Sequence, residues 1–332
     1  DTEYMTIYLP THRAERPAGI LASIPTIKKR TSVKKWHKVL GELRSMSIAL
    51  PGARHLFSHM QSALQTEKGG RIALRHGVHQ ALEDFRWIAK DISSRPTRIQ
   101  EIIPLKPSIM GDHDASGAGA GGVWFPTSTL DSRVSTSAPP ILWRFEWPKE
   151  VQEQLITEAN PHGTITNSDL ELAGGLLHLE AAAQCFDVRE RTLLSHTDNL
   201  ATLFWQRKGS ATTIKAPSFL LRQFGIHQRY HRYVPRHDYI SGPSNPLADD
   251  ASRLFHMSDA DFLHYFNTTY PQSESFHYWT PSKQLTSAVI SALLRKACKP
   301  ESLLVVPPPS KPSGKSGSPS PLTWASTPSR SH

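Results

Sequence analysis

The spacing of apolar residues divides the first hundred residues into one short strand and several helices. Met5, Ile7 and Leu9 alternate with polar neighbours, so they share one face of a strand that ends a hairpin. Apolar residues then recur every three or four positions, as in amphipathic helices, over 33–47, 53–64 and 78–92. Residues 1–100 are therefore predicted to form a hairpin end and a small helical unit.

Beyond Pro107 the pattern changes to short alternating runs separated by turn residues, which is typical of strands. The expected elements are strands at 108–113, 121–126 and 140–147, a helix from 167–169 to about 183, a strand at 192–195, helices at about 199–208 and 216–230, a strand near 230–234, and a helix at about 246–254. The first three strands read as an antiparallel meander. The order βββαβααβα predicts an α/β domain with a mixed sheet over residues 105–256.

Two further helices, at about 258–267 and 281–297, form a short helical extension over 257–300. Residues 301–332 are rich in Pro, Ser and Lys and cannot bury a core, so a disordered tail is expected there. The chain has 332 residues, of which 38% are hydrophobic. This length and composition suit two packed units and a tail.

The net charge of +9 is concentrated at one end of the chain. Residues 1–100 hold 17 Lys and Arg against 8 Asp and Glu, whereas the remainder holds 21 of each. Lysines and arginines gather at the start of the helical unit: Lys28, Lys29, Arg30, Lys34, Lys35, Lys38 and Arg44. Such a cluster is predicted to follow the phosphates of a nucleic acid, the alternative being a solubilising surface.

Cysteine use and hydropathy exclude several classes of protein. Cys185 and Cys298 are far apart and lack metal-ligand spacing, so neither a disulfide framework nor a zinc module is expected. An intracellular protein, nuclear or cytoplasmic, fits this composition. No apolar run approaches the roughly 20 residues that cross a bilayer, so no membrane partner is expected. The start lacks Met and a leader pattern, which suggests a piece of a longer protein.

Four acidic residues fall at predicted element boundaries. Asp114 ends a strand before the glycine-rich bend, Glu171 lies near the start of the first long helix, Asp198 ends a strand, and Asp249 lies in the helix at 246–254. Adjacent strand ends can bring them together, and carboxylates so close repel one another unless a cation neutralises them. Hard oxygen ligands suit Mg²⁺ or Mn²⁺, and two ions about 4 Å apart would make a phosphodiester-cleaving site.

The blocks around these acids carry a family resemblance. They read DASGAGAGGVWF (114–125), NSDLELAGGLLHL (167–179), LLSHTDNLATLFWQRKGS (193–210) and NPLADDASR (245–253). Together they resemble the four catalytic blocks of ribonuclease H domains in retroelement reverse transcriptases. Residues 1–10 and 33–60 resemble the palm end and the thumb or connection helices of these enzymes, especially in DIRS-like elements. SDADFLHYFNTTYPQ (258–272) resembles the segment that follows ribonuclease H there.

The resemblance implies a ribonuclease H-like fold and roles for named residues. Asp114 would bridge two Mg²⁺ or Mn²⁺ ions, Glu171 and Asp198 would complete the cage, and Asp249 would hold the second ion. Asp250 is the alternative fourth ligand. Three further residues are substrate-binding candidates by position: Ser116, Asn199 and Asn245.

The sequence departs from the family at one loop. Where the family has a histidine that assists proton transfer or product release, this chain reads YVPRHDYISGPSN (233–245), with Tyr233 at the histidine position. His237 is a candidate substitute. No paired polymerase aspartates occur, so DNA synthesis is not expected from this piece. The upstream polymerase portion of the same polyprotein is a predicted partner.

Other patterns compete with this interpretation. Gly117, Gly119 and Gly122 fit G-x-G-x-x-G, but a strand rather than a helix follows, which argues against a dinucleotide site. His227 and His231 stand four apart and could ligate zinc. Because no third ligand lies nearby and Arg222, Arg229 and Arg232 surround them, a basic surface that touches nucleic acid is favoured.

The leading hypothesis is a metal-dependent endoribonuclease that cuts the RNA strand of RNA–DNA hybrids. One alternative is a catalytically decayed retroelement fragment that only binds nucleic acid. Another is a different nuclease or recombinase on the same fold.

Overall fold

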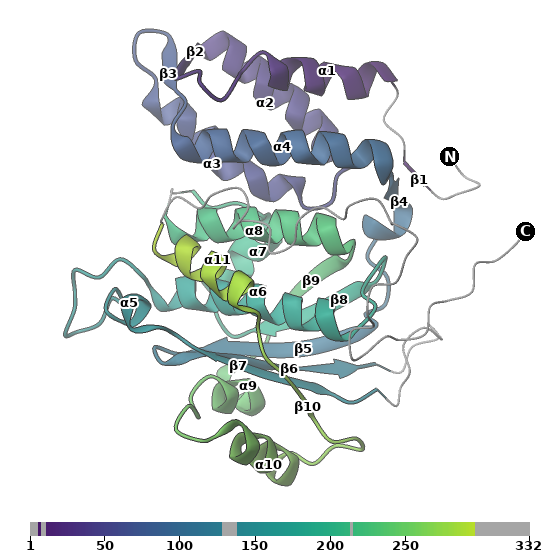
Figure 1. Cartoon of the computed structure of the whole chain (residues 1–332), viewed down its shortest axis with the longest axis vertical. Helices are drawn as coiled ribbons and strands as arrows, with labels where there is room; N and C mark the ends of the chain where they lie inside the picture. Colours follow the sequence, from purple (N-terminus) through teal and green to yellow (C-terminus); the bar gives the residue numbers. More distant parts are fainter. Residues whose placement is uncertain (1–5, 8–10, 128–137, 213–214, 296–332) are drawn as a thin grey trace, which may run out of the picture.

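The chain folds into a helical unit stacked on a sheet that carries helices on both faces. The computed structural model describes residues 6–7, 11–127, 138–212 and 215–295. In Figure 1, α1–α4 form the top layer, α6, α7, α8 and α11 lie between them and the sheet, and α9 and α10 lie below it.

The helical unit is built from short elements around its own core. They are β1 (Thr6–Ile7), α1 (Thr11–Ala22), β2 (Arg30–Ser32), α2 (Val33–Ser47), η1 (Ala53–Leu56), α3 (Phe57–Ser62), η2 (Ala63–Thr66), β3 (Arg71–Ala73), α4 (His76–Ser94), β4 (Thr97–Arg98) and η3 (Ile99–Glu101). The helices predicted at 33–47 and 78–92 are confirmed as α2 and α4. The single helix predicted at 53–64 is wrong, because 3-10 turns flank a short α3 there. The pattern also missed α1, which contains Pro17 and has few apolar residues.

The predicted mixed sheet is confirmed and has one more strand than expected. Its strands are β5 (Ile109–Ala115), β6 (Gly119–Pro126), β7 (Ile141–Glu146), β8 (Thr192–Thr197), β9 (Val234–Tyr239) and β10 (His277–Trp279). Their spatial order is β10-β7-β6-β5-β8-β9. The pairs β5–β6 and β6–β7 are antiparallel, whereas β8 runs parallel to both β5 and β9. The strand predicted near 230–234 begins later, at Val234, because α8 continues to His231.

Helices cover both faces of this sheet. They are α5 (Lys149–Gln152), α6 (Asn167–Cys185), α7 (Leu200–Lys208), α8 (Ala216–His231), η4 (Gly242–Ser244), α9 (Pro246–Ala251), α10 (Asp259–Thr269) and α11 (Lys283–Leu293). The largest core lies between the sheet and α6, α8 and α11, and a smaller, partly aromatic core lies between the opposite face of the sheet and α9 and α10. Helix α6 is buried along nearly its whole length, as its apolar sequence predicts.

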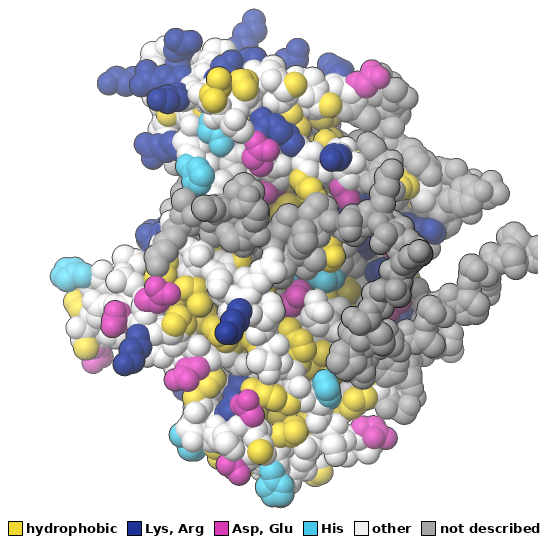
Figure 2. All heavy atoms as spheres, viewed as in Figure 1, with side chains coloured by type: hydrophobic (Ala, Val, Ile, Leu, Met, Phe, Trp, Pro, Cys, Tyr) yellow, Lys and Arg dark blue, Asp and Glu magenta, His cyan; other side chains and the backbone are white. Residues whose placement is uncertain are grey.

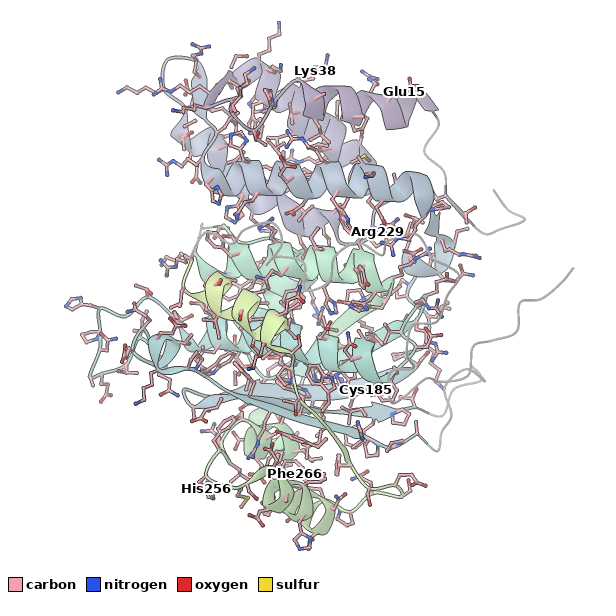
Figure 3. The ribbon with its side chains drawn as sticks, viewed as in Figure 1. Glu15, Lys38, Cys185, Arg229, His256 and Phe266 are labelled. Carbon is pink, nitrogen blue, oxygen red and sulfur yellow. The ribbon has the colours of Figure 1, made fainter. Side chains whose placement is uncertain are left out.

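The polar side of α8 is buried against the helical unit, so the predicted basic surface there is wrong. Arg222 pairs with Asp84, with one Nη2–Oδ1 distance of 2.9 Å. Arg229 is fully buried, and its Nε donates to Asp91 Oδ2 over 2.8 Å. Figure 3 shows Arg229 at the boundary between the two units. Paired buried charges therefore hold the helical unit on α8, where the sequence suggested solvent-facing arginines.

Backbones also approach closely at this boundary. A Cβ added at Gly52 would lie 2.2 Å from the carbonyl oxygen of Gly225 in α8, and Gly52 has a φ of +83°. Only glycine satisfies both conditions. Ile226 of α8 completes the core of the helical unit.

Residues after 256 add to the main sheet and its helices. The expected helices are present as α10 and α11, and β10 pairs in parallel with β7. The sequence pattern missed β10. The predicted tail at 301–332 and Cys298 lie outside the described residues. Within the described part of the chain, no helix is both long and apolar enough to span a bilayer.

Candidate metal centre

Asp114 lies at the end of β5, where the hairpin turns into β6. It faces Gly121 across the antiparallel pair, and a Cβ at Gly121 would come within 2.4 Å of the backbone of Ala251. The missing side chain therefore lets α9 lie directly against the sheet beside Asp114. The Ser252 hydroxyl, just after α9, donates to Asp114 Oδ2 over 2.6 Å. This bond fixes the orientation of a buried carboxylate.

Glu171 reaches the same place from α6. Thr166 caps this helix by accepting from the Asp169 amide, and the Asp169 carboxylate accepts from the Thr166 amide. This capping box fixes where α6 begins and hence which way its second turn points. Glu171 is 1% exposed, and its Oε2 has no hydrogen-bond partner among the described residues. An unpaired buried carboxylate oxygen is costly unless something positive neutralises it.

Asp198 follows β8 directly, and Asn199 then caps α7 by accepting from the Thr202 amide over 3.1 Å. Strand β8 ends at Thr197 and the cap of α7 is Asn199, so Asp198 lies between the end of the strand and the start of the helix. Gly242 of η4 lies beside it, since a Cβ there would be 3.1 Å from Asp198 Oδ2.

The structure brings three of the four predicted acids together. One carboxylate oxygen from each of Asp114, Glu171 and Asp198 lies within 4.8 Å of the others. Burial, followed by the charges of Asp114 and Asp198, raises the pKa of Glu171 well above its ordinary value. Burial also raises the pKa of Asp114 and of Asp198, and the charge of Asp249 adds to both effects, whereas hydrogen bonds with Ser252 and Glu171 oppose the rise at Asp114. A divalent cation would remove this repulsion, so the donor set fits Mg²⁺ or Mn²⁺.

The fourth acid lies beside this group without belonging to it. Asp249 is half-buried, its charge acts on both Asp114 and Asp198, and its Oδ1 accepts from Arg253 Nε over 2.7 Å. Asp250 turns the other way, where its Oδ2 accepts from the Tyr265 and Tyr270 hydroxyls over 2.8 and 2.7 Å. The geometry thus places Asp249 toward the acids and Asp250 toward α10.

The polar residues predicted to bind substrate make contacts within the protein. The Ser116 hydroxyl donates to the Ser252 carbonyl over 2.7 Å and is buried. Asn199 is the α7 cap. Asn245 donates from Nδ2 to the His113 carbonyl over 3.2 Å, while its buried Oδ1 has no partner within the described chain. These bonds tie the loop before α9 to the strands that carry the acids.

His237 lies inside β9 and is not part of the group formed by Asp114, Glu171 and Asp198. It lies opposite Ser195 of the neighbouring strand β8, and it is 6% exposed. Burial and the nearby His113, His55 and Arg54 lower its pKa well below the ordinary value. The charged groups that act on His237 are therefore arginines and other histidines, which disfavour its protonation. Tyr233, at the family's histidine position, is also buried.

Four of the seven predicted phosphate-binding residues lie on α2, at the far side of the helical unit, whereas Lys28 and Lys29 precede β2 and Arg30 begins it. Lys34, Lys38 and Arg44 are exposed, and Lys35 is half-buried, with Nζ donating to the Ser23 carbonyl over 3.2 Å. Figure 2 shows lysines and arginines gathered over this end of the molecule, and Figure 3 shows Lys38 there. A groove of about 620 Å³ runs between α1 and α2, and Lys34, Lys35, Lys38 and Arg16 line it.

The sequence indicated one of two further groupings only in part and missed the other. Asp112 and His196, two residues before Asp114 and Asp198, pair over 2.7 Å between β5 and β8. The alternating Asp-His-Asp of β5 and the Ser-His-Thr-Asp run of β8 are the signals that could have indicated this. The second grouping joins Glu180 of α6 to His227 and His231 of α8. The spacing of the two histidines indicated possible zinc ligands, but the expectation that no third ligand lies nearby is wrong, because Glu180 comes from another helix.

No protein-family model and no curated protein matches the sequence. Among solved structures, the chain is similar to foamy viral protease-reverse transcriptase. In complex with dsDNA, that protein shares 9% identity at a TM-score of 0.26, covering 83% of this chain and 42% of its own. In complex with an RNA/DNA hybrid, the values are 11%, 0.25, 70% and 27%. The chain thus spans less than half the length of the matched chain in each structure. The similarity is distant, and the functional argument rests on the site itself.

Proposed function

We propose that this chain is a metal-dependent endoribonuclease that cuts the RNA strand of RNA–DNA hybrids, within a retroelement reverse transcriptase polyprotein. The observation that carries the proposal is the group formed by Asp114, Glu171 and Asp198. Three elements far apart in sequence deliver carboxylate oxygens within 4.8 Å of one another, and one of these oxygens is buried without a partner. Folding without a function would not be expected to retain such mutual repulsion.

The sheet supports the proposal independently of the acids. Strands β5, β6 and β7 form an antiparallel meander, and β8 and β9 continue the sheet in parallel on the other side of β5. This order and the following α6 agree with the ribonuclease H-like fold that the sequence blocks imply. The acids then lie on the central strand, on its parallel neighbour and on the helix that packs over both.

The residues have distinct parts in this proposal. Asp114, Glu171 and Asp198 would hold one Mg²⁺ or Mn²⁺, and Asp114 with Asp249 would hold a second. When bound, the ions supply the charge that activates a water and stabilises the leaving oxygen. Ser252 orients the Asp114 carboxylate, and Arg253 holds Asp249 toward the group. Asp250 accepts hydrogen bonds from Tyr265 and Tyr270 and is not proposed as a ligand.

Binding of the hybrid is assigned to the basic side of α2. Lys34, Lys38 and Arg44 present exposed cations on one helix, with Lys35 in the adjoining groove. Contacts of this kind read phosphates rather than bases, and selection for a hybrid comes from 2′-hydroxyls and helix shape. The upstream polymerase portion is proposed to extend this surface.

Cleavage of a labelled hybrid in Mg²⁺ tests the assignment. Asp114→Asn and Asp249→Asn should reduce cleavage at least about a hundredfold, a loss of roughly 2.7 kcal/mol of transition-state stabilisation. Asp250→Asn should retain most activity, and Glu158→Gln, on an exposed loop, is the matched control. Equal rates for the native protein and Asp114→Asn would overturn the proposal.

The burial of His237 favours a second candidate, a chain that binds hybrids without cutting them. Among the described residues, the group around Asp114 includes no histidine, and Tyr233, at the position where the family has one, is buried. Salt-dependent hybrid binding without Mg²⁺-stimulated cleavage would support this candidate, whereas preferential cleavage of duplex DNA would favour another nuclease or recombinase.

A further inference from the structure

Helices α6 and α8 share a buried group of two histidines and one carboxylate, separate from the acids at the strand ends. His227 and His231 lie one turn apart on α8, and Glu180 faces them from α6. One ligand atom from each lies within 4.8 Å of the other two. From this arrangement we propose a second metal site, which binds Zn²⁺ or a similar transition-metal ion through Glu180, His227 and His231.

The distances around Glu180 favour ligation. His231 Nε2 lies 3.4 Å from Glu180 Oε2 and makes no hydrogen bond of normal geometry. Two ligands that share a tetrahedral zinc ion, each about 2.0–2.1 Å from it, lie about 3.3 Å apart. The His231 ring is mostly buried, and its Nε2 is shielded from water beside the Glu180 carboxylate. A histidine that only paired with the carboxylate would be expected to come closer, as His227 does.

His227 carries the partner that a metal-binding histidine usually has. Its Nε2 is 2.6 Å from Glu180 Oε2, and its Nδ1 is 2.9 Å from the Tyr233 hydroxyl. With an ion bound, Nε2 would be a ligand and Nδ1–H would donate to Tyr233, which fixes the ring. The Nε2–Oε2 separation would then widen by about 0.7 Å to reach the spacing of ligands on one ion.

The donor set separates this site from the acids near Asp114. Two imidazoles and one carboxylate suit zinc, whereas an all-carboxylate group suits Mg²⁺ or Mn²⁺. Three protein ligands leave a fourth position for water. The site joins α6, which carries Glu171, to α8, which carries the arginines that hold the helical unit. A bound ion would therefore stabilise the unit against the sheet.

Metal titration of the full chain tests the site. Metal-free protein is titrated with Co²⁺ and then Zn²⁺ in millimolar Mg²⁺, which occupies the acidic site. The native chain should bind one ion with a tetrahedral Co²⁺ absorption spectrum that Zn²⁺ abolishes, and Zn²⁺ should raise its thermal midpoint by a few degrees. Asp114→Asn should behave like the native chain.

His231→Gln is the main variant, because His231 is the least buried of the three ligands and its Nε2 makes no hydrogen bond of normal geometry. It should weaken Zn²⁺ binding at least about tenfold. His264→Asn, at an exposed position on α10, is the control and should change nothing. Circular dichroism establishes that each variant is folded, and Glu180→Gln replaces His231→Gln if the latter is not. Native protein that binds no Zn²⁺ at 100 times the chain concentration, or equal binding by a folded ligand variant, would overturn the proposal.

Discussion

Replacing Glu171 by Gln removes one charge from the acidic group while nearly preserving its shape. Burial and the charges of Asp114 and Asp198 raise the pKa of Glu171 well above its ordinary value. An acid with a raised pKa in the folded state stabilises the fold below its unfolded pKa, and that contribution is lost as pH rises through the folded pKa. Without a divalent cation, Glu171 should therefore destabilise the fold more at pH 8 than at pH 5, and comparison with Glu171→Gln isolates this contribution from those of the buried histidines.

The size of this effect follows from the geometry. Two charges 4.8 Å apart repel by about 3.5 kcal/mol at an effective dielectric constant of 20. The gain or loss of one proton changes the free energy of unfolding by at most about 1.4 kcal/mol per pH unit. The three pH units between pH 5 and pH 8 are therefore enough for the whole repulsion energy to appear in the stability. Relative to the native chain, Glu171→Gln should gain about 3 kcal/mol more at pH 8 than at pH 5.

Urea unfolding in EDTA at both pH values measures this difference. Comparing the two pH values cancels any hydrogen bond that the amide gains or loses, and Glu158→Gln controls for removal of an exposed charge. Adding Mg²⁺ at pH 8 should stabilise the native chain more than the variant. If the variant's gain is the same at both pH values, Glu171 carries no buried charge and the electrostatic account of the site is wrong.

Arg229→Met should lower the free energy of unfolding by about 1.5–3 kcal/mol, because it removes charged hydrogen bonds from buried acids that Arg95 and Arg232 still pair; urea titration measures this loss. Gly121→Ala should cost about 1–3 kcal/mol through its clash with the backbone of α9, whereas Gly41→Ala, with open space around it, should cost nothing in the same thermal melts. Lys38→Gln should weaken hybrid binding regardless of sequence and reduce the slope of log affinity against log salt by about one, as fluorescence anisotropy would show; an unchanged slope would remove Lys38 from the phosphate contacts.

Local patterns were sufficient for most elements of the sheet unit. The change of period near Pro107, the turn residues between the strands and the polar caps of the helices are all properties of neighbouring residues. They predicted β5 to β8 and the helices from α6 to α11, because period and capping act within a few positions. They failed at α1, which contains Pro17, and at β10, which has only three residues and forms by pairing with the distant β7.

Packing decided what the charged residues do. The sequence could not choose between Asp249 and Asp250, which are neighbours on one short helix. The structure turns Asp250 to the tyrosines of α10 and leaves Asp249 beside Asp114. Arg222 and Arg229 were predicted to be exposed, because no neighbouring residue indicates that acids of α4 pair with them in the interior.

The sequence by itself therefore determined the order of elements and marked the acids at their ends, because both depend on short-range periodicity and turn chemistry. Only the tertiary structure decided which acids meet, which arginines are buried, and that Glu180 lies against His227 and His231. Those outcomes depend on distances between elements dozens of residues apart, which no local pattern records.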